Sequence, residues 1–223
     1  MSLEAYNLKS TVIISAEDAA DFLAKMDISI VDINAGLEAG EQAAGNTGID
    51  APATAAGTRR WFDTTEVIRR ELRTKGPWRI ENPKNRPLVV HLGGDYRMGI
   101  LGGDANTGIP DPDVVPKANR KKGAATEESV NANQEALFYL NKPADNTLRE
   151  VIGSLPPAGH WFLLYYRDEE EIRCEISLPS PSFEGGQFQS WQCRVILPPI
   201  DKTAVDRNKI PDIGGGDVEF QIA

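Results

Sequence analysis

Nine basic side chains between residues 59 and 122 are the strongest candidates for chemistry in this chain. Five are arginines on or just before one amphipathic segment, and four lie close together in a segment without periodicity. They are Arg59, Arg60, Arg69, Arg70, Arg73, Lys117, Arg120, Lys121 and Lys122, and we call them the predicted basic patch. Guanidinium and ammonium groups gathered in this way bind phosphates or carboxylates. For the five arginines taken alone, the favoured interpretation is the solvated face of an amphipathic helix, because basic helix faces usually have no special role.

The patch lies in a basic centre between two acidic ends. Residues 58–122 carry 14 basic and 8 acidic side chains, a net charge of +6. Residues 1–57 carry 2 basic and 9 acidic side chains, and residues 123–223 carry 8 basic and 16 acidic ones, within a chain of net charge −9. This asymmetry predicts docking on an acidic protein surface, on another copy of the chain, or on a nucleic acid.

The histidines and cysteines do not form a known catalytic or metal motif. His91 and His160 each border an apolar strand, away from any Ser or Cys nucleophile motif, which favours a packing role. Cys174 and Cys193 fall on expected core faces and lack the close pair spacing of a zinc site. We therefore predict no metal and no cofactor, and we identify no catalytic residue.

The segment 102–121 has no hydrophobic periodicity and is rich in turn-forming residues. Asp104, Asn106 and Gly108 match the start of a calcium-binding loop, but Ile109 and Val115 stand where that loop needs glycine and a bidentate glutamate. Turn preferences of Asp, Asn, Gly and Pro explain the segment better. Glycine pairs at 93–94 and 102–103 lack a phosphate-binding motif, and the acidic run 168–171 is typical of a solvated hairpin tip.

The N-terminal third predicts a small unit followed by a linker. Residues 10–15 and 28–33 are short β-branched runs, and an amphipathic segment ending near Met26 separates them, which predicts a β-α-β unit over residues 1–33. Thirteen of the 24 residues from 34 to 57 are Ala or Gly and none is aromatic. Such a segment buries little apolar surface, so we predict a mobile linker or loop.

Two helices and a hairpin are expected in the central part. Asp63 and Glu66 form a capping box that predicts a helix from Thr64, and Lys75 followed by Gly-Pro predicts its end. Residues 87–92 and 96–101 predict a hairpin, and a second helix is expected from about Thr126 to before residue 143. On that helix Asn133 and Gln134 are expected to be satisfied buried amides rather than ligand contacts.

The C-terminal part predicts an antiparallel β-meander of strands at 160–167, 171–178 and 191–197. The first strand is apolar on both faces and is expected to be central. In the second strand Glu175 alternates with apolar residues and is placed on the face opposite to Cys174. The third strand is expected to point Trp191 inward with Cys193, and residues 217–222 suggest a last strand. The predicted core residues are Trp161, Leu163, Ile172, Ile176, Trp191, Val195 and Leu197.

These observations predict an α+β fold in which residues 58–223 form the main domain, an antiparallel meander packed by two or three helices. No apolar run reaches the length of a membrane span, and the start of the chain lacks a secretory signal, so we expect a cytoplasmic protein. The leading functional hypothesis is a non-enzymatic binding or adaptor protein that docks its basic centre on an acidic protein or on itself. The alternative is a nucleic-acid-associated protein, and the third is an enzyme with an unrecognised site.

Overall fold

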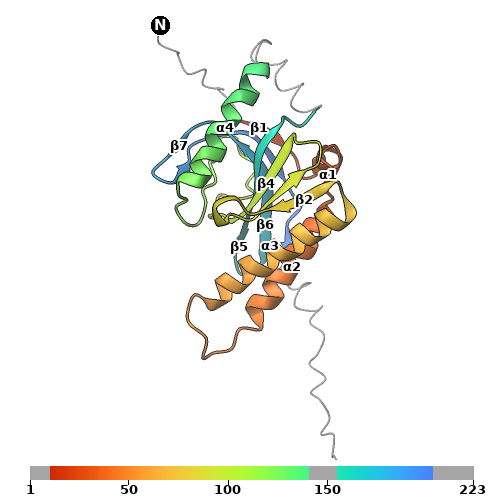
Figure 1. Ribbon diagram of the computed structural model, residues 1–223. Coiled ribbons are helices and arrows are strands. Elements are labelled where there is room, and N and C mark those ends of the chain that lie inside the picture. Colours follow the sequence, from red (N-terminus) through yellow and green to blue (C-terminus); the bar gives the residue numbers. More distant parts are fainter. Residues whose placement is uncertain (1–10, 141–154, 203–223) are drawn as a thin grey trace, which may run out of the picture.

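The computed structural model describes residues 11–140 and 155–202, with the backbone alone at 134–140, and within these ranges it has an α+β fold (Figure 1). Its helices are α1 (Ala19–Ala24), α2 (Ile30–Gly45), α3 (Ala55–Lys75) and α4 (Ala124–Leu140), with a 3-10 turn at Pro83–Asn85. Its strands are β1 (Val12–Ile14), β2 (Trp78–Glu81), β3 (Leu88–His91), β4 (Tyr96–Gly102), β5 (Gly159–Arg167), β6 (Glu171–Pro179), β7 (Phe183–Glu184), β8 (Gln187–Phe188), β9 (Trp191–Ile196) and β10 (Ile200–Asp201).

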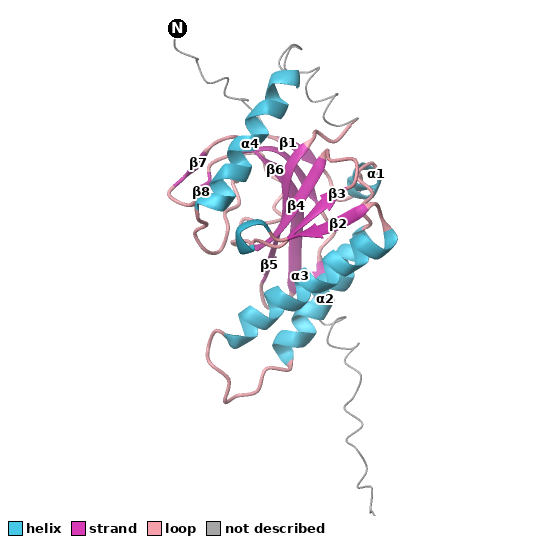
Figure 2. Ribbon diagram, in the orientation of Figure 1, coloured by secondary structure: helices cyan, strands magenta, loops and turns pink. Residues whose placement is uncertain are grey.

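A mixed sheet forms the centre of the molecule, with strand order β1-β9-β6-β5-β4-β3-β2 and with β10 paired to β6 (Figure 2). The pairs β1–β9 and β4–β5 are parallel, and the other pairs in this sheet are antiparallel. Strands β7 and β8 form a separate two-stranded hairpin. The predicted hairpin is confirmed as β3–β4, and the predicted meander is confirmed as β5–β6–β9. The suggested strand at 217–222 lies outside the described residues.

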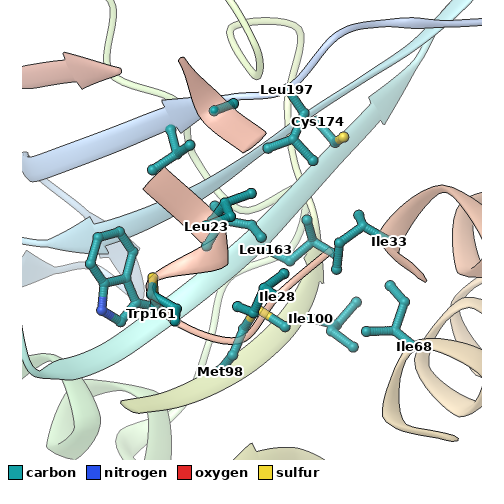
Figure 3. Close-up of a cluster of buried hydrophobic side chains, with 14 of the residues drawn as sticks. Leu23, Ile28, Ile33, Ile68, Met98, Ile100, Trp161, Leu163, Cys174 and Leu197 are labelled. Carbon is teal, nitrogen blue, oxygen red and sulfur yellow. The ribbon is translucent and has the colours of Figure 1, made fainter. Parts of the chain in front are cut away.

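The larger hydrophobic core lies between the sheet and the helices α1, α2 and α3. Figure 3 shows Leu23, Ile33 and Ile68 from these helices meeting Met98 and Leu163 from the strands. Each of these side chains is at most 1% exposed to solvent. Apolar burial of this kind stabilises a domain by roughly 25 cal/mol for each Å² removed from water, so this layer is the main source of stability.

The opposite face of the sheet carries a second, smaller core. Phe162 and Leu164 of β5 point into it, while Leu163 between them points into the larger core. Val130 of α4 and Phe188 of β8 cover this face. Strand β5 is therefore buried on both sides and lies between β4 and β6, which confirms its predicted central position.

The predicted β-α-β unit and the start of the predicted linker are corrected by the structure. Residues 28–33 are not a strand: Ser29 is the N-cap of α2, its side chain accepts a hydrogen bond from the backbone N–H of Val31, and the helix continues to Gly45. A short apolar run has no clear period, so helix and strand cannot be separated by pattern alone. Residues 34–45, expected in a linker, therefore belong to a helix.

Small residues in α2 allow a close contact with α3, and this is the physical reason for the correction. A Cβ atom added at Gly36 would lie 2.3 Å from Ile68 Cγ1, and one added at Gly40 would lie 2.0 Å from Thr64 Oγ1. The two helices run side by side (Figure 1). The glycines thus let α3 pack closely against α2, and this packing stabilises the helix. The Ala and Gly composition alone indicated a flexible segment, because it does not reveal the neighbouring helix.

The predicted start of the central helix is wrong, although its end is confirmed. Helix α3 begins at Ala55 with Thr54 as its N-cap, so Asp63 is not a cap and lies inside the helix. Helix formation continues upstream because alanine has the highest helix propensity. The helix ends at Lys75 as predicted, with Gly76 as its C-cap. The earlier start places Arg59, Arg60 and the following aromatic residues on the helix.

The seven predicted core residues of the meander are all buried, but Trp191 lies on the unexpected face. The pairing of β6 with β9 shifts between Leu178 and Pro179, which face Cys193 and Trp191 respectively. This bulge adds one residue, Gln192, to β9, and an extra residue reverses the face of everything beyond it. Trp191 therefore packs in the smaller core, while Cys193 and Val195 pack in the larger one.

Candidate functional site

A cleft of about 670 Å³ lies where α3, the end of β4 and the end of β5 meet. Strands β4 and β5 are parallel, with Gly102 paired to Tyr165, so their carboxyl ends open on the same edge of the sheet. In sheets with parallel strands, this edge is a common place for ligand binding. The lining residues are Gly57, Thr58, Arg60, Trp61 and Phe62 of α3, residues 102–105, Asn119, Arg120 and Lys122 of the loop before α4, and residues 165–167 of β5.

Two of the cations at the cleft are already paired with a carboxylate. Glu41 of α2 accepts hydrogen bonds from Arg60 through both of its oxygens. The same carboxylate lies 3.1 Å from Arg167 Nε, and its side chain is only 11% exposed. Glu41 therefore ties α2, α3 and the end of β5 together, and it neutralises part of the positive charge of this wall.

The other two cations have no acidic partner among the described residues. Arg120 is exposed and Lys122 is half-buried, and neither forms an ion pair within residues 11–140 and 155–202. Burial lowers the pKa of Lys122, and the nearby charge of Arg120 lowers the pKa further. A half-buried ammonium group beside another cation is electrostatically unfavourable, so an anion in the cleft would relieve the repulsion.

Aromatic rings form the remaining wall of the cleft. Trp61 and Phe62 have ring centroids 5.3 Å apart, and the Trp61 indole N–H donates to the carbonyl of Ile100 at 3.0 Å. The Phe62 side chain is 57% exposed, so its ring is accessible to a ligand. Burial raises the pKa of Tyr165 to about 12, so its phenol stays neutral at physiological pH. The cleft therefore combines cationic and aromatic surface.

Three residues of the predicted basic patch line the cleft: Arg60, Arg120 and Lys122. Arg69 donates to the carbonyl of Glu81 and to Asn82, and Arg70 pairs with Glu71 at 3.2 Å. Arg73 is exposed on the same helix. Since an α-helix rises about 1.5 Å per residue, these three arginines lie about 14–20 Å along α3 from Arg60.

The three remaining patch residues lie near the cleft without lining it. Lys117 donates to the carbonyl of Phe188, which anchors the loop to β8. Arg59 donates to Thr47 Oγ1 at 3.4 Å, and Lys121 is exposed. The predicted basic patch is therefore not one surface: three of its residues line the cleft, three lie farther along α3, and three lie near the cleft without lining it.

Sequence reasoning missed Arg167, the aromatic wall and Glu41. Arg167 is the last residue of β5 and immediately precedes the acidic run 168–171, which was interpreted as a solvated tip. A charged residue at the end of a central apolar strand is a sequence signal that could have identified Arg167 as a candidate site residue. Trp61 and Phe62 carried no such signal, because the predicted helix began after them.

The loop between β4 and α4 is held on the sheet by a buried ion pair. Arg194 of β9 donates to the carbonyls of Ile109, Asp111 and Val114, and it pairs with Glu175 of β6 at 2.7 Å. Both side chains are completely buried. Asp111 Oδ1 also accepts from the N–H of Asp113, in keeping with the predicted turn chemistry. The two ends of this loop carry cleft residues, so the pair fixes the loop that forms one wall.

The histidines and cysteines are not among the described residues that line the cleft. His91 Nε2 lies 3.0 Å from Asp27 Oδ2, and burial, with a smaller effect of nearby arginines, lowers the pKa of His160 to about 4. Cys174 and Cys193 are buried and not in a disulfide, and burial raises both pKa values. Over the described ranges, no group of three or more His, Cys, Asp or Glu side chains is arranged to hold a metal ion.

Asn133 is a satisfied buried amide, as predicted. It donates to the carbonyl of His160 at 3.2 Å and accepts from the backbone N–H of the same residue at 2.7 Å. The side chain of Gln134 is not among those described.

Comparison with protein-family models, with curated proteins and with solved structures finds no match to this chain. Within the part of the chain that the structure describes, no helix is both long and apolar enough to cross a membrane.

Proposed function

We propose that this protein is a non-enzymatic binding protein that receives an acidic protein partner in the cleft. The observation that carries the proposal is the pair of cations, Arg120 and Lys122, which line the cleft without a carboxylate partner among the described residues. Trp, Tyr and Arg side chains dominate the energetic centres of protein interfaces, and the cleft presents all three types.

The side chains of the cleft support binding rather than catalysis. The described residues that line the cleft include no histidine and no cysteine, and the one carboxylate among them, Asp104, accepts from the backbone N–H of Asn106. Histidine, cysteine and paired carboxylates are the groups that general acid–base or nucleophilic chemistry uses most often. The unpaired cysteines are also consistent with the reducing cytoplasm, which we propose as its location.

Charge favours a protein partner over a nucleic acid. The whole chain carries a net charge of −9, which repels a polyanion, and Glu41 already engages two of the four cations at the cleft. An acidic protein segment in which neutral residues separate the carboxylates carries its charges more sparsely than a nucleic acid does, so the acidic chain repels it less. Nucleic-acid binding, the alternative, is supported by the combination of rings and cations, which is typical of surfaces that bind single strands.

The test measures binding of a fluorescent peptide of alternating Glu and Ala and of fluorescent oligothymidylate by anisotropy, at low and at physiological salt. We expect the peptide to bind and Arg120→Gln with Lys122→Gln to weaken it at least about tenfold, since hydrogen bonds to charged groups are worth about 1.5–3 kcal/mol. Arg59→Gln with Lys121→Gln is the matched control, because it removes the same two charges, one arginine and one lysine, from exposed neighbours that do not line the cleft.

Equal weakening by Arg59→Gln with Lys121→Gln would show that only overall charge matters, and it would overturn the proposal. Binding of oligothymidylate alone, with the same dependence on Arg120 and Lys122, would favour the nucleic-acid alternative.

A further inference from the structure

The cleft has two chemically distinct parts. Arg120 and Lys122 supply positive charge from the loop before α4, while Trp61 and Phe62 supply aromatic surface from α3. A site for carboxylates alone has no use for an exposed phenyl ring, which would lie in water at a free-energy cost. The two parts together therefore match a ligand that carries both an anionic group and an apolar one.

Resting on the proposed function, we infer that the cleft recognises an acidic peptide segment in which an aromatic residue accompanies the carboxylates. The carboxylates lie against Arg120 and Lys122, and the aromatic side chain packs on Phe62 and Trp61. Aromatic pairs of this kind contribute beyond the area that they bury. The anionic part supplies attraction, and the aromatic part supplies selectivity among acidic partners.

The aromatic wall is already ordered before a ligand arrives. Trp61 is held by the hydrogen bond from its indole N–H to the carbonyl of Ile100, and its ring contacts that of Phe62. Both residues lie on a 21-residue helix whose backbone is fixed by its packing on α2. A preformed surface loses little conformational entropy on binding, so contacts made on it are retained as affinity.

The cleft also offers polar groups suited to a peptide backbone. Asn119 lines the cleft with an exposed side chain, and its side-chain carboxamide forms no hydrogen bond within the described residues. A carboxamide has two donors and an acceptor, so it can pair with both the N–H and the C=O of a bound peptide unit. A nucleic-acid backbone has acceptors but no comparable donor.

A polynucleotide fits this arrangement less well than a peptide. Proteins that bind single strands combine ring stacking with a positively charged groove that follows the backbone. Here the two cations without an acidic partner among the described residues are near neighbours in one wall, and the other two cations of the lining, Arg60 and Arg167, share the carboxylate of Glu41. The positive charge is local rather than continuous.

The experiment compares three fluorescent peptides of equal length: one alternating Glu and Phe, one alternating Glu and Ala, and polyglutamate. Oligothymidylate is the fourth probe. Each is titrated against the full chain, against Phe62→Ala and against Arg120→Gln. Phe62 is exposed on a helix, and alanine favours helices, so Phe62→Ala should fold; circular dichroism and thermal unfolding verify this. Leu92→Ala, at an exposed position in the turn between β3 and β4, is the matched control.

We expect the wild-type protein to prefer the Glu–Phe peptide over the Glu–Ala peptide by about tenfold, and Phe62→Ala to remove that preference. Arg120→Gln should weaken both peptides alike, because it acts on the charge that they share. Leu92→Ala should change neither. The peptide change from Phe to Ala and the protein change Phe62→Ala form a double-mutant cycle. If their effects on the binding free energy are not additive, the difference measures the contact between the peptide ring and Phe62.

The outcomes separate this inference from the proposed function. Equal affinity for the three peptides, unchanged by Phe62→Ala but lowered by Arg120→Gln, would overturn the aromatic requirement and leave the acidic-partner proposal standing. Binding of oligothymidylate without binding of any peptide would overturn both. Failure of all four probes to bind at millimolar concentration would overturn both as well.

Discussion

Glu175 and Arg194 form an ion pair from which water is excluded: their closest atoms are 2.7 Å apart and both side chains are completely buried. They lie on adjacent strands, β6 and β9, under the loop that joins β4 to α4. Glu175 also accepts from the backbone N–H of Gly108 at 2.8 Å and from the Ser177 hydroxyl at 2.7 Å. Removing charge from water is costly, and these extra hydrogen bonds are what make the burial tolerable.

Arg194→Met should destabilise the protein by about 3–5 kcal/mol, because it leaves the Glu175 carboxylate buried without a partner. The double variant Glu175→Leu with Arg194→Met should recover part of the loss, since it removes both charges. The free energy of unfolding is measured by chemical denaturation. Hydrogen exchange should also show faster exchange of the Gly108 amide in the single variant. Stability equal to wild type in Arg194→Met would contradict the buried pair.

Gly36→Ala should destabilise the protein by about 1–3 kcal/mol, because the added methyl group overlaps Ile68 in the contact between α2 and α3. Gly57→Ala is the control: it lies in α3 with open space around the added atom, so it should stabilise by about 0.5–1 kcal/mol. Thermal or chemical unfolding measures both. Should Gly36→Ala prove as stable as the control, the close contact of the two helices would be wrong.

Stability should fall as the pH is lowered from about 6.5 toward 4, in part because of His160. Its pKa in the folded protein is about 4, below the ordinary histidine value of 6.5, so the unfolded chain binds a proton in this range and the folded protein does not. The contribution lost is up to about 3 kcal/mol at the acidic end. Carboxylates titrate in the same window, so the measurement is the difference between wild type and His160→Gln. A difference independent of pH would contradict the low pKa.

Arg70→Ala with Arg73→Ala should leave polyglutamate affinity within about twofold of wild type. These arginines lie about 15–20 Å along α3 from Arg60, beyond the Debye length of about 8 Å at physiological ionic strength. Anisotropy under the conditions used for Arg120→Gln provides the comparison. A loss as large as that of Arg120→Gln would mean that the whole basic patch acts as one surface.

Local patterns in the sequence were sufficient for the meander and for the helix end at Lys75. Strand β6 alternates along its length, and one face of a strand repeats every second residue whatever its neighbours are. The end of α3 follows from glycine and proline, which act on the backbone directly. These features depend on residues adjacent in the chain, so they can be identified without a structure.

The cleft depended on contacts between distant parts of the chain. Arg60, Arg120 and Arg167 are separated by about 50 residues or more, and the parallel pairing of β4 with β5 is what brings two of the walls together. Nothing in the local pattern around Arg167 reveals that pairing. The candidate site could therefore be predicted only as a basic segment, and three of its nine residues line the cleft.

The sequence by itself determined the α+β class, the buried faces of β5 and β6, and the concentration of positive charge in the middle of the chain. Only the tertiary structure decided that residues 34–45 are helical, that Glu175 and Arg194 are buried, and that two cations without an acidic partner in the described part of the chain lie beside an aromatic wall. The physical reason is the same in each case. Glycine is favourable in α2 only against α3, and a charge is tolerable inside the molecule only when its partner and covering loop are present.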